Sequence, residues 1–340
     1  MKMKSKIAAL AVCLLAPVLA ANAQKTEVRL ATILPKGLAQ DNIITKLAED
    51  WRKASEGAVT LRKAPGGQKD GEAGIVKKLE SRNYQAALLS ATGLAQIDND
   101  LQALQGMPLL FQNWDEVDYV RGRIQSELEE KLRARGYVLL FWADAGWVNF
   151  FSVQKATSPD DFKKLKMFAW GGNAHQIEIM KSLGYKPVAL ETDYLHSGFA
   201  SRMIESAPLP PGFASGMQIP TVAPHMLDLN WSPVVGAAII RKDVWDAIPA
   251  DVQAKLAALC QKAGEDMRQE GRRFHDDTVA TLRKGPKTQV NTPTAAELAE
   301  WRKLGAEIAP KVRGSIIPAG MFDEVQQALK EYRATKAATN

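Results

Sequence analysis

The sequence predicts a two-domain α/β protein with hinge strands and one long helix that spans both domains. Strand-like and helix-like segments alternate from Val28 onward, as in βαβ units around a mostly parallel sheet. About 317 residues follow residue 23, more than one core usually holds. Apolar residues keep helical spacing from Pro249 to Gly285, which predicts a helix on the order of 45–50 Å long, more than one small domain is wide.

Residues 1–23 are predicted to be a signal peptide. Three lysines form a basic start, Ile7–Ala20 is apolar, and Ala21-Asn22-Ala23 has the small-x-small form of a cleavage site. The apolar run has 14 residues, fewer than the roughly 20 that a membrane-spanning helix needs. We therefore expect cleavage near Ala23 and export to the periplasm.

Charge and cysteine content exclude several classes of protein. Removing residues 1–23 lowers the formal net charge from +6 to +3, and scattered charges of this kind do not indicate a nucleic-acid partner. Cys260 is the only cysteine that remains, so no internal disulfide can form. Its spacing to apolar neighbours predicts a packed helix position. We expect a monomer without a cofactor.

The first part of the chain is predicted to form domain I. Asp115 is the expected N-cap of the helix that precedes the last of these strands, and Gly136 is its expected end. The expected strands are Val28–Thr32, Val59–Lys63, Ala86–Ser90 and Val138–Trp142, and the expected helices are Gln40–Ala54, Gly71–Ser81 and Asp115–Ala134.

The second part continues this alternation. Three prolines in Ser206–Phe213 argue against a helix and against an internal strand, so we expect an ordered loop. Val138–Ser152, Val234–Ile240 and the long helix should cross between the domains. Domain I should hold residues 24–145 and 232–274, and domain II residues 146–231 and 275–340. The remaining elements are expected at Ala174–Leu183, Pro187–Leu190, Asp193–Ile204, Val234–Ile240, Ala295–Ile308 and Phe322–Ala337.

Aromatic residues concentrate in Val138–Gly172. Tryptophan combines a large apolar area with one N–H donor, so it serves cores and ligand cavities alike. Asp144 and Gly146 add a polar group and a bend where a plain strand would continue. We expect part of this stretch to line a ligand cavity. Its aromatic residues include three of the eight tryptophans: Phe141, Trp142, Trp147, Phe150, Phe151, Phe168 and Trp170.

The chain resembles the substrate-binding proteins of tripartite ATP-independent periplasmic (TRAP) transporters over nearly all of its mature length. The order and spacing of several short segments carry the resemblance. It implies a cleft between two α/β domains that closes on a small molecule and delivers it to an integral-membrane TRAP permease. The matching segments are Val28–Pro35, Ala64–Gln68, Met107–Phe111, Ser158–Met167 and Val244–Pro249.

Position 168 departs from the family pattern. Related proteins carry an arginine in this strand that grips a ligand carboxylate with two hydrogen bonds, and Phe168 stands at the matching position. The family's second, polar cleft loop matches the more apolar Glu205–Pro211. We therefore expect a neutral, hydrophobic or aromatic ligand. Alternatively, Phe168 packs into a core and Arg202, Lys36 or Lys69 grips a carboxylate.

Several functions remain open. The chain could be an organic-acid binder that uses a different cation, or a periplasmic carrier of lipid or another hydrophobe that works without a TRAP permease. The four histidines show no metal-binding spacing, and no nucleophile elbow is present, so we do not expect an enzyme. The expected ligand-binding residues are Leu34, Pro35, Gly66, Gly67, Ser90, Thr92, Trp142, Asp144, Trp147, Phe168, Trp170, Pro208, Leu209 and Trp231.

Overall fold

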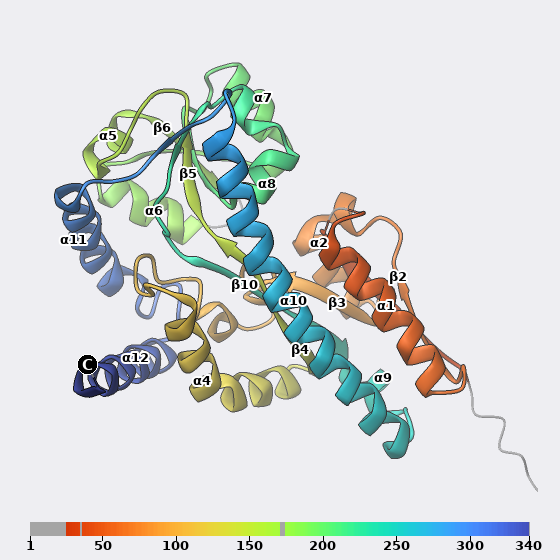
Figure 1. Ribbon diagram of the computed structural model, residues 1–340. Helices are drawn as coiled ribbons and strands as arrows, with labels where there is room; N and C mark the ends of the chain where they lie inside the picture. The colour runs from red at the N-terminus through yellow and green to blue at the C-terminus, as the bar shows by residue number, and fades with distance from the viewer. Residues whose placement is uncertain (1–24, 35, 171–173, 340) are drawn as a thin grey trace, which may run out of the picture.

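The computed structural model describes residues 25–34, 36–170 and 174–339. The predicted signal peptide and Pro35 lie outside the described residues. Figure 1 shows two α/β domains with helix α10 (Ala250–Lys284) lying across both. This two-domain fold with a long spanning helix confirms the predicted fold class.

Two mixed sheets form within the described residues. Domain I holds a five-stranded sheet in the order β2-β1-β3-β10-β4, and domain II a six-stranded sheet in the order β11-β9-β5-β8-β6-β7. β1, β2 and β3 are parallel, and β10 runs antiparallel to β3 and β4. The strands are β1 (Thr26–Thr32), β2 (Val59–Lys63), β3 (Ala86–Ser90), β4 (Tyr137–Trp147), β5 (Asn149–Ser152), β6 (Lys166–Trp170), β7 (Lys186–Leu190), β8 (Ser206–Leu209), β9 (His225–Leu227), β10 (Pro233–Arg241) and β11 (Gln289–Asn291).

Helices cover both sheets. α1 and α10 enclose one apolar cluster against the first sheet, which includes Trp51 and Cys260. The helices are α1 (Ala39–Ala54), α2 (Gly67–Glu80), α3 (Ala91–Leu94), α4 (Trp114–Ala134), α5 (Pro159–Lys164), α6 (Ala174–Ser182), α7 (Leu195–Ala200), α8 (Pro211–Gly216), α9 (Lys242–Asp246), α10, α11 (Ala295–Val312) and α12 (Ala319–Thr339), with 3-10 turns η1 (Asn99–Gln102), η2 (Thr192–Tyr194) and η3 (Ile219–Thr221).

Helix α10 lies directly on strand β4 because glycines remove the side chains between them. A Cβ atom on Gly271 would lie 1.7 Å from the carbonyl oxygen of Asp144, and one on Gly264 would lie 2.7 Å from the Cβ of Phe141. Neither position can hold a larger residue without displacing the helix from the strand. The first half of α10 is therefore held firmly against domain I.

Three sequence predictions about local structure were wrong. Ser206–Phe213 is not a loop: β8 pairs with both β5 and β6, and α8 follows. The prolines are tolerated because β8 is only four residues long and Pro211 opens a helix, where no N–H is needed. Asn113, not Asp115, caps α4, and its side chain accepts from Glu116 N. The helix expected over Asp193–Ile204 is a 3-10 turn followed by the short α7.

Helix α12 packs beside domain I. Arg333 Nε donates to Glu116 Oε1 on α4 at 2.8 Å, and its Nη2 donates to the carbonyl of Leu110 at 2.8 Å. The sequence analysis had placed residues 275–340 entirely in domain II. In contrast, α11 lies against α5, where Trp301 Nε1 donates to the carbonyl of Thr157 at 2.8 Å. The other expected domain boundaries stay predictions.

Candidate functional site: the facing edges of two sheets

The carboxyl ends of the described strands, except β5 and β10, point toward the junction between the domains. β4 runs in the same direction as β1–β3 and passes into β5 with only Val148 between them. Asn149, the first residue of β5, pairs with Leu209, the last residue of β8. β6 and β7 run parallel to β8, so their carboxyl ends also face domain I. Ligands of open α/β sheets bind beyond such strand ends.

In domain I this edge, here called the domain I wall, is built from turns and backbone groups. Gly66 has a φ of 90°, and a Cβ on Gly67 would lie 2.6 Å from the carbonyl oxygen of Thr32. Only glycine lets α2 begin this close to the end of β1. Leu34 is half-buried beside this contact.

Ser90 and Thr92 follow β3 on the same wall. Ser90 donates from Oγ to Glu72 Oε2 at 2.7 Å and from its backbone N–H to Glu72 Oε1 at 2.6 Å. Burial raises the pKa of the Glu72 carboxyl, and the hydrogen bonds from Ser90 oppose that rise. Ser90 therefore links the end of β3 to α2. Thr92 is half-buried and places its hydroxyl beside this link.

In domain II the edge, here called the domain II wall, is aromatic. Phe168 and Trp170 share one face of β6, since side chains alternate along a strand. Phe168 is only 7 % exposed within an apolar cluster that includes Leu209, and most of its surface is already covered. Trp170 is half-buried at the strand end, where its Nε1 donates to Glu191 Oε2 at 3.1 Å. Pro208 is also half-buried.

Three exposed apolar side chains at these edges were missed by the sequence analysis. Ile33 follows β1 and is 38 % exposed, Tyr194 follows β7 and is 61 % exposed, and Phe213 follows β8 and is 39 % exposed. Large apolar side chains at such exposure are unusual when they gather at one place. Their position in the sequence could have identified them, because each of the three residues stands within four residues of a strand's carboxyl end.

The domain II wall carries no lysine or arginine. The chain has no lysine or arginine from 167 to 180, from 187 to 201, or from 203 to 240. Arg202 follows α7, and its carbonyl accepts from Lys166, the first residue of β6. It thus lies at the opposite edge of the sheet, about 13 Å from the carboxyl end, given about 3.3 Å per strand residue. Of the alternative cations, only Lys36 and Lys69 lie beside the site, both exposed on the domain I wall.

The structure does not bring Trp142 and Asp144 to this site. Trp142 is 4 % exposed and packs in the core on the face of β4 away from α10. The Asp144 side chain is fully buried, where it pairs with Arg121 on α4 and accepts from Arg272 Nε at 2.8 Å and Nη2 at 2.6 Å. Both predictions failed because the sequence does not show which face of β4 the helices cover.

Trp147 and Trp231 lie where the strands cross between the domains. Trp231 packs at 5.2 Å from Phe150 and 5.7 Å from Trp301, measured between ring centroids, so it belongs to an aromatic core. Trp147 packs at 4.9 Å from Trp114, measured between ring centroids, and its backbone N–H donates to His275 Nδ1 at 3.3 Å.

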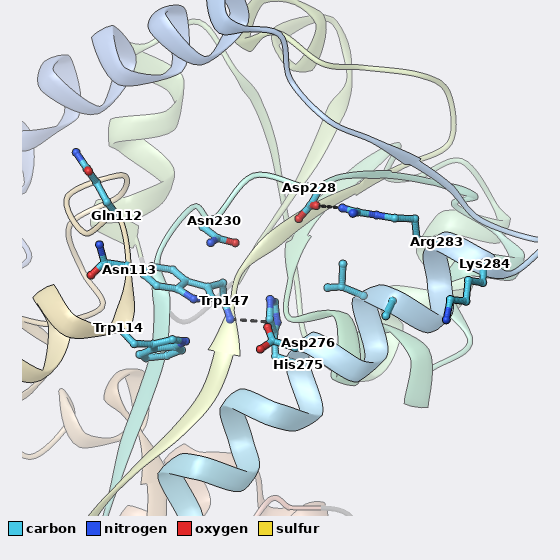
Figure 2. Close-up of a pocket in the computed structure, with 12 residues that line it drawn as sticks. Gln112, Asn113, Trp114, Trp147, Asp228, Asn230, His275, Asp276, Arg283 and Lys284 are labelled. Atoms are coloured by element: carbon cyan, nitrogen blue, oxygen red, sulfur yellow. Dashed lines mark hydrogen bonds and ion pairs between the residues drawn. The ribbon is translucent and has the colours of Figure 1, made fainter.

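Trp147 also lines a pocket of about 500 Å³ on the α4 side of the crossing strands. Figure 2 shows Gln112, Asn113 and Trp114 on one side of it and α10 on the other. Burial lowers the pKa of His275 there, which keeps its ring neutral and its Nδ1 an acceptor. Of the expected ligand-binding residues only Trp147 lines this pocket, so it is distinct from the edges described above.

Neither a metal site nor a reactive thiol is found among the described residues. Among residues 25–34, 36–170 and 174–339, no group of three or more acidic, histidine or cysteine side chains could hold a metal ion. Cys260 is buried, and burial raises the pKa of its thiol to about 12. Over the same part of the chain, no helix combines the length and apolar character that crossing a membrane requires.

Comparison with known proteins agrees with this architecture. Residues 30–314 match the family model of bacterial extracellular solute-binding proteins, family 7 (DctP). The C4-dicarboxylate-binding periplasmic protein DctP of Rhodobacter capsulatus is 25% identical over 270 residues, which cover 76% of this chain and 78% of that protein.

Solved structures show the same fold. A TRAP periplasmic solute-binding protein of Shewanella oneidensis with bound succinate has a TM-score of 0.80 at 16% identity, and covers 90% of this chain and 99% of its own. The sugar-acid-binding protein DctPAm of Advenella mimigardefordensis in complex with galactonate has a TM-score of 0.81 at 17% identity, with 91% and 99% covered.

The fold and the facing strand edges define a two-domain solute-binding protein. More particularly, the chain belongs to family 7 of the bacterial extracellular solute-binding proteins, the DctP family of TRAP transporter substrate-binding proteins. Members of this family are binding receptors, not enzymes, and act outside the cytoplasm. The fold likeness at these identities does not extend to the ligand.

Proposed function

We propose that this protein captures a neutral, hydrophobic or aromatic solute between its two walls in the periplasm and delivers it to a TRAP permease. The observation that carries the proposal is the composition of the domain II wall. It combines Trp170, Tyr194 and Phe213 with the carboxylate of Glu191 and carries no lysine or arginine. A carboxylate enclosed there would meet a like charge and no lysine or arginine partner, which costs several kcal/mol.

Closure of the cleft follows from the same surfaces. Ile33 on one wall is exposed, and so are Tyr194 and Phe213 on the other. A ligand that touches both walls would favour the state in which they approach, by the difference of its affinity for the two states. An apolar ligand that buries about 200 Å² of surface there would gain roughly 5 kcal/mol before the costs of association.

An organic acid is the second candidate. It is favoured by the relatives, since the two structures above contain succinate and galactonate. Of the three cations named in the alternative, Lys36 and Lys69 lie on the domain I wall and could then bind the carboxylate. The ligand's acidic end would have to face domain I and its remaining part the aromatic wall.

Native mass spectrometry of the mature protein from its own host tests the proposal. We expect a retained neutral apolar or aromatic compound, and an N-terminus at or near Gln24. Calorimetry with succinate and galactonate should give no heat of binding, whereas the retained compound should quench tryptophan fluorescence. Tight binding of a simple C4 dicarboxylate to the unaltered protein would overturn the proposed ligand class and favour the organic-acid reading.

A further inference from the structure

The C-terminal helices connect the two domains on the side away from the walls. α11 is attached to domain II through Trp301 and Thr157, and α12 to domain I through Arg333 and Glu116. The chain therefore crosses between the domains once more, in residues 313–318. Figure 1 shows α11 and α12 on the opposite side of the crossing strands from α2 and α8, which adjoin the walls.

On this rear side the domain I segment before α4 and helix α11 share one buried apolar cluster, and one of their contacts is especially close. Leu109, in the domain I segment before α4, adopts a φ of 57°, which is uncommon for a branched residue. Its N–H donates to the carbonyl of Trp231 at 2.6 Å. A Cβ on Gly305 of α11 would lie only 3.2 Å from the Cβ of Leu109 and 3.3 Å from the carbonyl oxygen of Pro108. A methyl group on Gly305 would therefore fit only if Leu109 or Pro108 moved by a few tenths of an ångström.

The position of this contact gives it a mechanical consequence. Rotation about the crossing strands that brings the two walls together separates the elements on the rear side, and the reverse rotation presses them together. Because Leu109 and Pro108 already meet Gly305, further separation of the walls is blocked there. Tightly packed surfaces resist such overlap.

We propose that the contact of Leu109 and Pro108 with Gly305 is a rear stop that sets how far the cleft opens. Leu109 and Gly305 are positioning residues that touch no ligand, and they act through the angle between the walls. The inference depends on domain rotation and is independent of the ligand's chemistry. A pocket of about 150 Å³ beside the contact is lined by Leu110, Arg302 and Ala306, so the contact is local and single substitutions can alter it.

The test measures the distance between the walls without any ligand. Spin labels are attached to cysteines introduced at the exposed positions Lys77 on α2 and Ser201 after α7, and the buried Cys260 does not react. Gly305→Val adds bulk at the stop and should shorten the mean distance between labels. Leu109→Ala removes Cδ1, which lies 3.6 Å from the position of a Gly305 Cβ, and should lengthen the distance by a smaller amount, because the Leu109 Cβ and the Pro108 carbonyl remain. The two shifts have opposite signs, which a merely structural role would not produce.

A matched control is available in Gly122→Ala, with Gly305→Ala as its counterpart. Both glycines lie inside helices, but a Cβ on Gly122 meets nothing within 4 Å. Both changes raise helix propensity equally, but only Gly305→Ala should change the mean distance between the spin labels. Unchanged distances in Leu109→Ala and in a folded Gly305 variant, or shifts of the same sign in both, would overturn the proposal. If Gly305→Val fails to fold, Gly305→Ala and Leu109→Ala still decide it.

Discussion

The two walls of the cleft differ in the side chains and backbone groups that they present. The domain I wall presents a glycine turn, the hydroxyl of Thr92 and two exposed lysines. The domain II wall presents Trp170, Tyr194 and Phe213 with an acidic partner and no lysine or arginine. The fold is shared with proteins that hold succinate and galactonate, so the fold alone does not determine the ligand. Under the proposed function, the difference between the walls favours a ligand with an apolar body that faces domain II.

The largest expected effect concerns Asp144, which the structure assigns to neither wall. Asp144→Ala leaves Arg121 and Arg272 without their buried counter-charge, and breaking such a pair typically costs 3–5 kcal/mol of stability. We expect a loss of that size in urea unfolding, with ligand affinity unchanged in the folded fraction. The control Asp118→Asn removes a half-exposed partner of the same arginines and should cost less than about 1 kcal/mol. Loss of ligand affinity without loss of stability would instead indicate that Asp144 contacts the ligand.

Phe168→Arg tests whether an arginine at position 168 confers acid binding. Phe168 is 7 % exposed among apolar neighbours, so a guanidinium there is buried without a partner and should cost about 3 kcal/mol of stability or more. We expect weaker binding of the native ligand and no binding of succinate by calorimetry. Phe168→Leu should cost about 1 kcal/mol and keep the ligand. A gain of tight succinate binding in Phe168→Arg would contradict the account of the domain II wall.

Trp170→Ala tests the aromatic wall itself. Removing about 100 Å² of apolar contact should weaken ligand binding by roughly 2.5 kcal/mol, or about 50- to 100-fold. Tryptophan fluorescence titration measures this directly. Trp170→Phe keeps most of the apolar surface and loses only the N–H that Glu191 accepts, so it should retain much of the affinity. Equal affinities in all three proteins would mean that the ligand does not touch this wall.

The smallest effects are expected at the lysines of domain I. If the ligand is neutral, Lys36→Ala and Lys69→Ala should each change its affinity less than about threefold, no more than the control Lys46→Ala on the far helix α1. A carboxylate ligand gripped by one of them would lose 2–5 kcal/mol instead. Titration at low and at high salt separates these cases, because only the charged interaction is screened.

Local patterns predicted much of the architecture but little of the site's detail. β2 and β3 begin and end where the sequence indicated, and α10 lies between Pro249 and Gly285 as expected. Hydrophobic periodicity and helix-ending residues each act over only a few positions. Both can therefore be recognised in the sequence alone. At the site, the same patterns predicted which turns follow the strands. They could not show that Tyr194 and Phe213 would stay exposed beside Trp170.

The sequence by itself determined the family, the β/α alternation and the phenylalanine at position 168. Only the tertiary structure decided that Asp144 is a buried ion-pair partner, that Arg202 lies at the far edge of its sheet, and that α12 returns to domain I. The physical reason is that these outcomes depend on which face of a strand another element covers. Gly271 lets α10 cover one face of β4, and that contact joins residues more than a hundred positions apart.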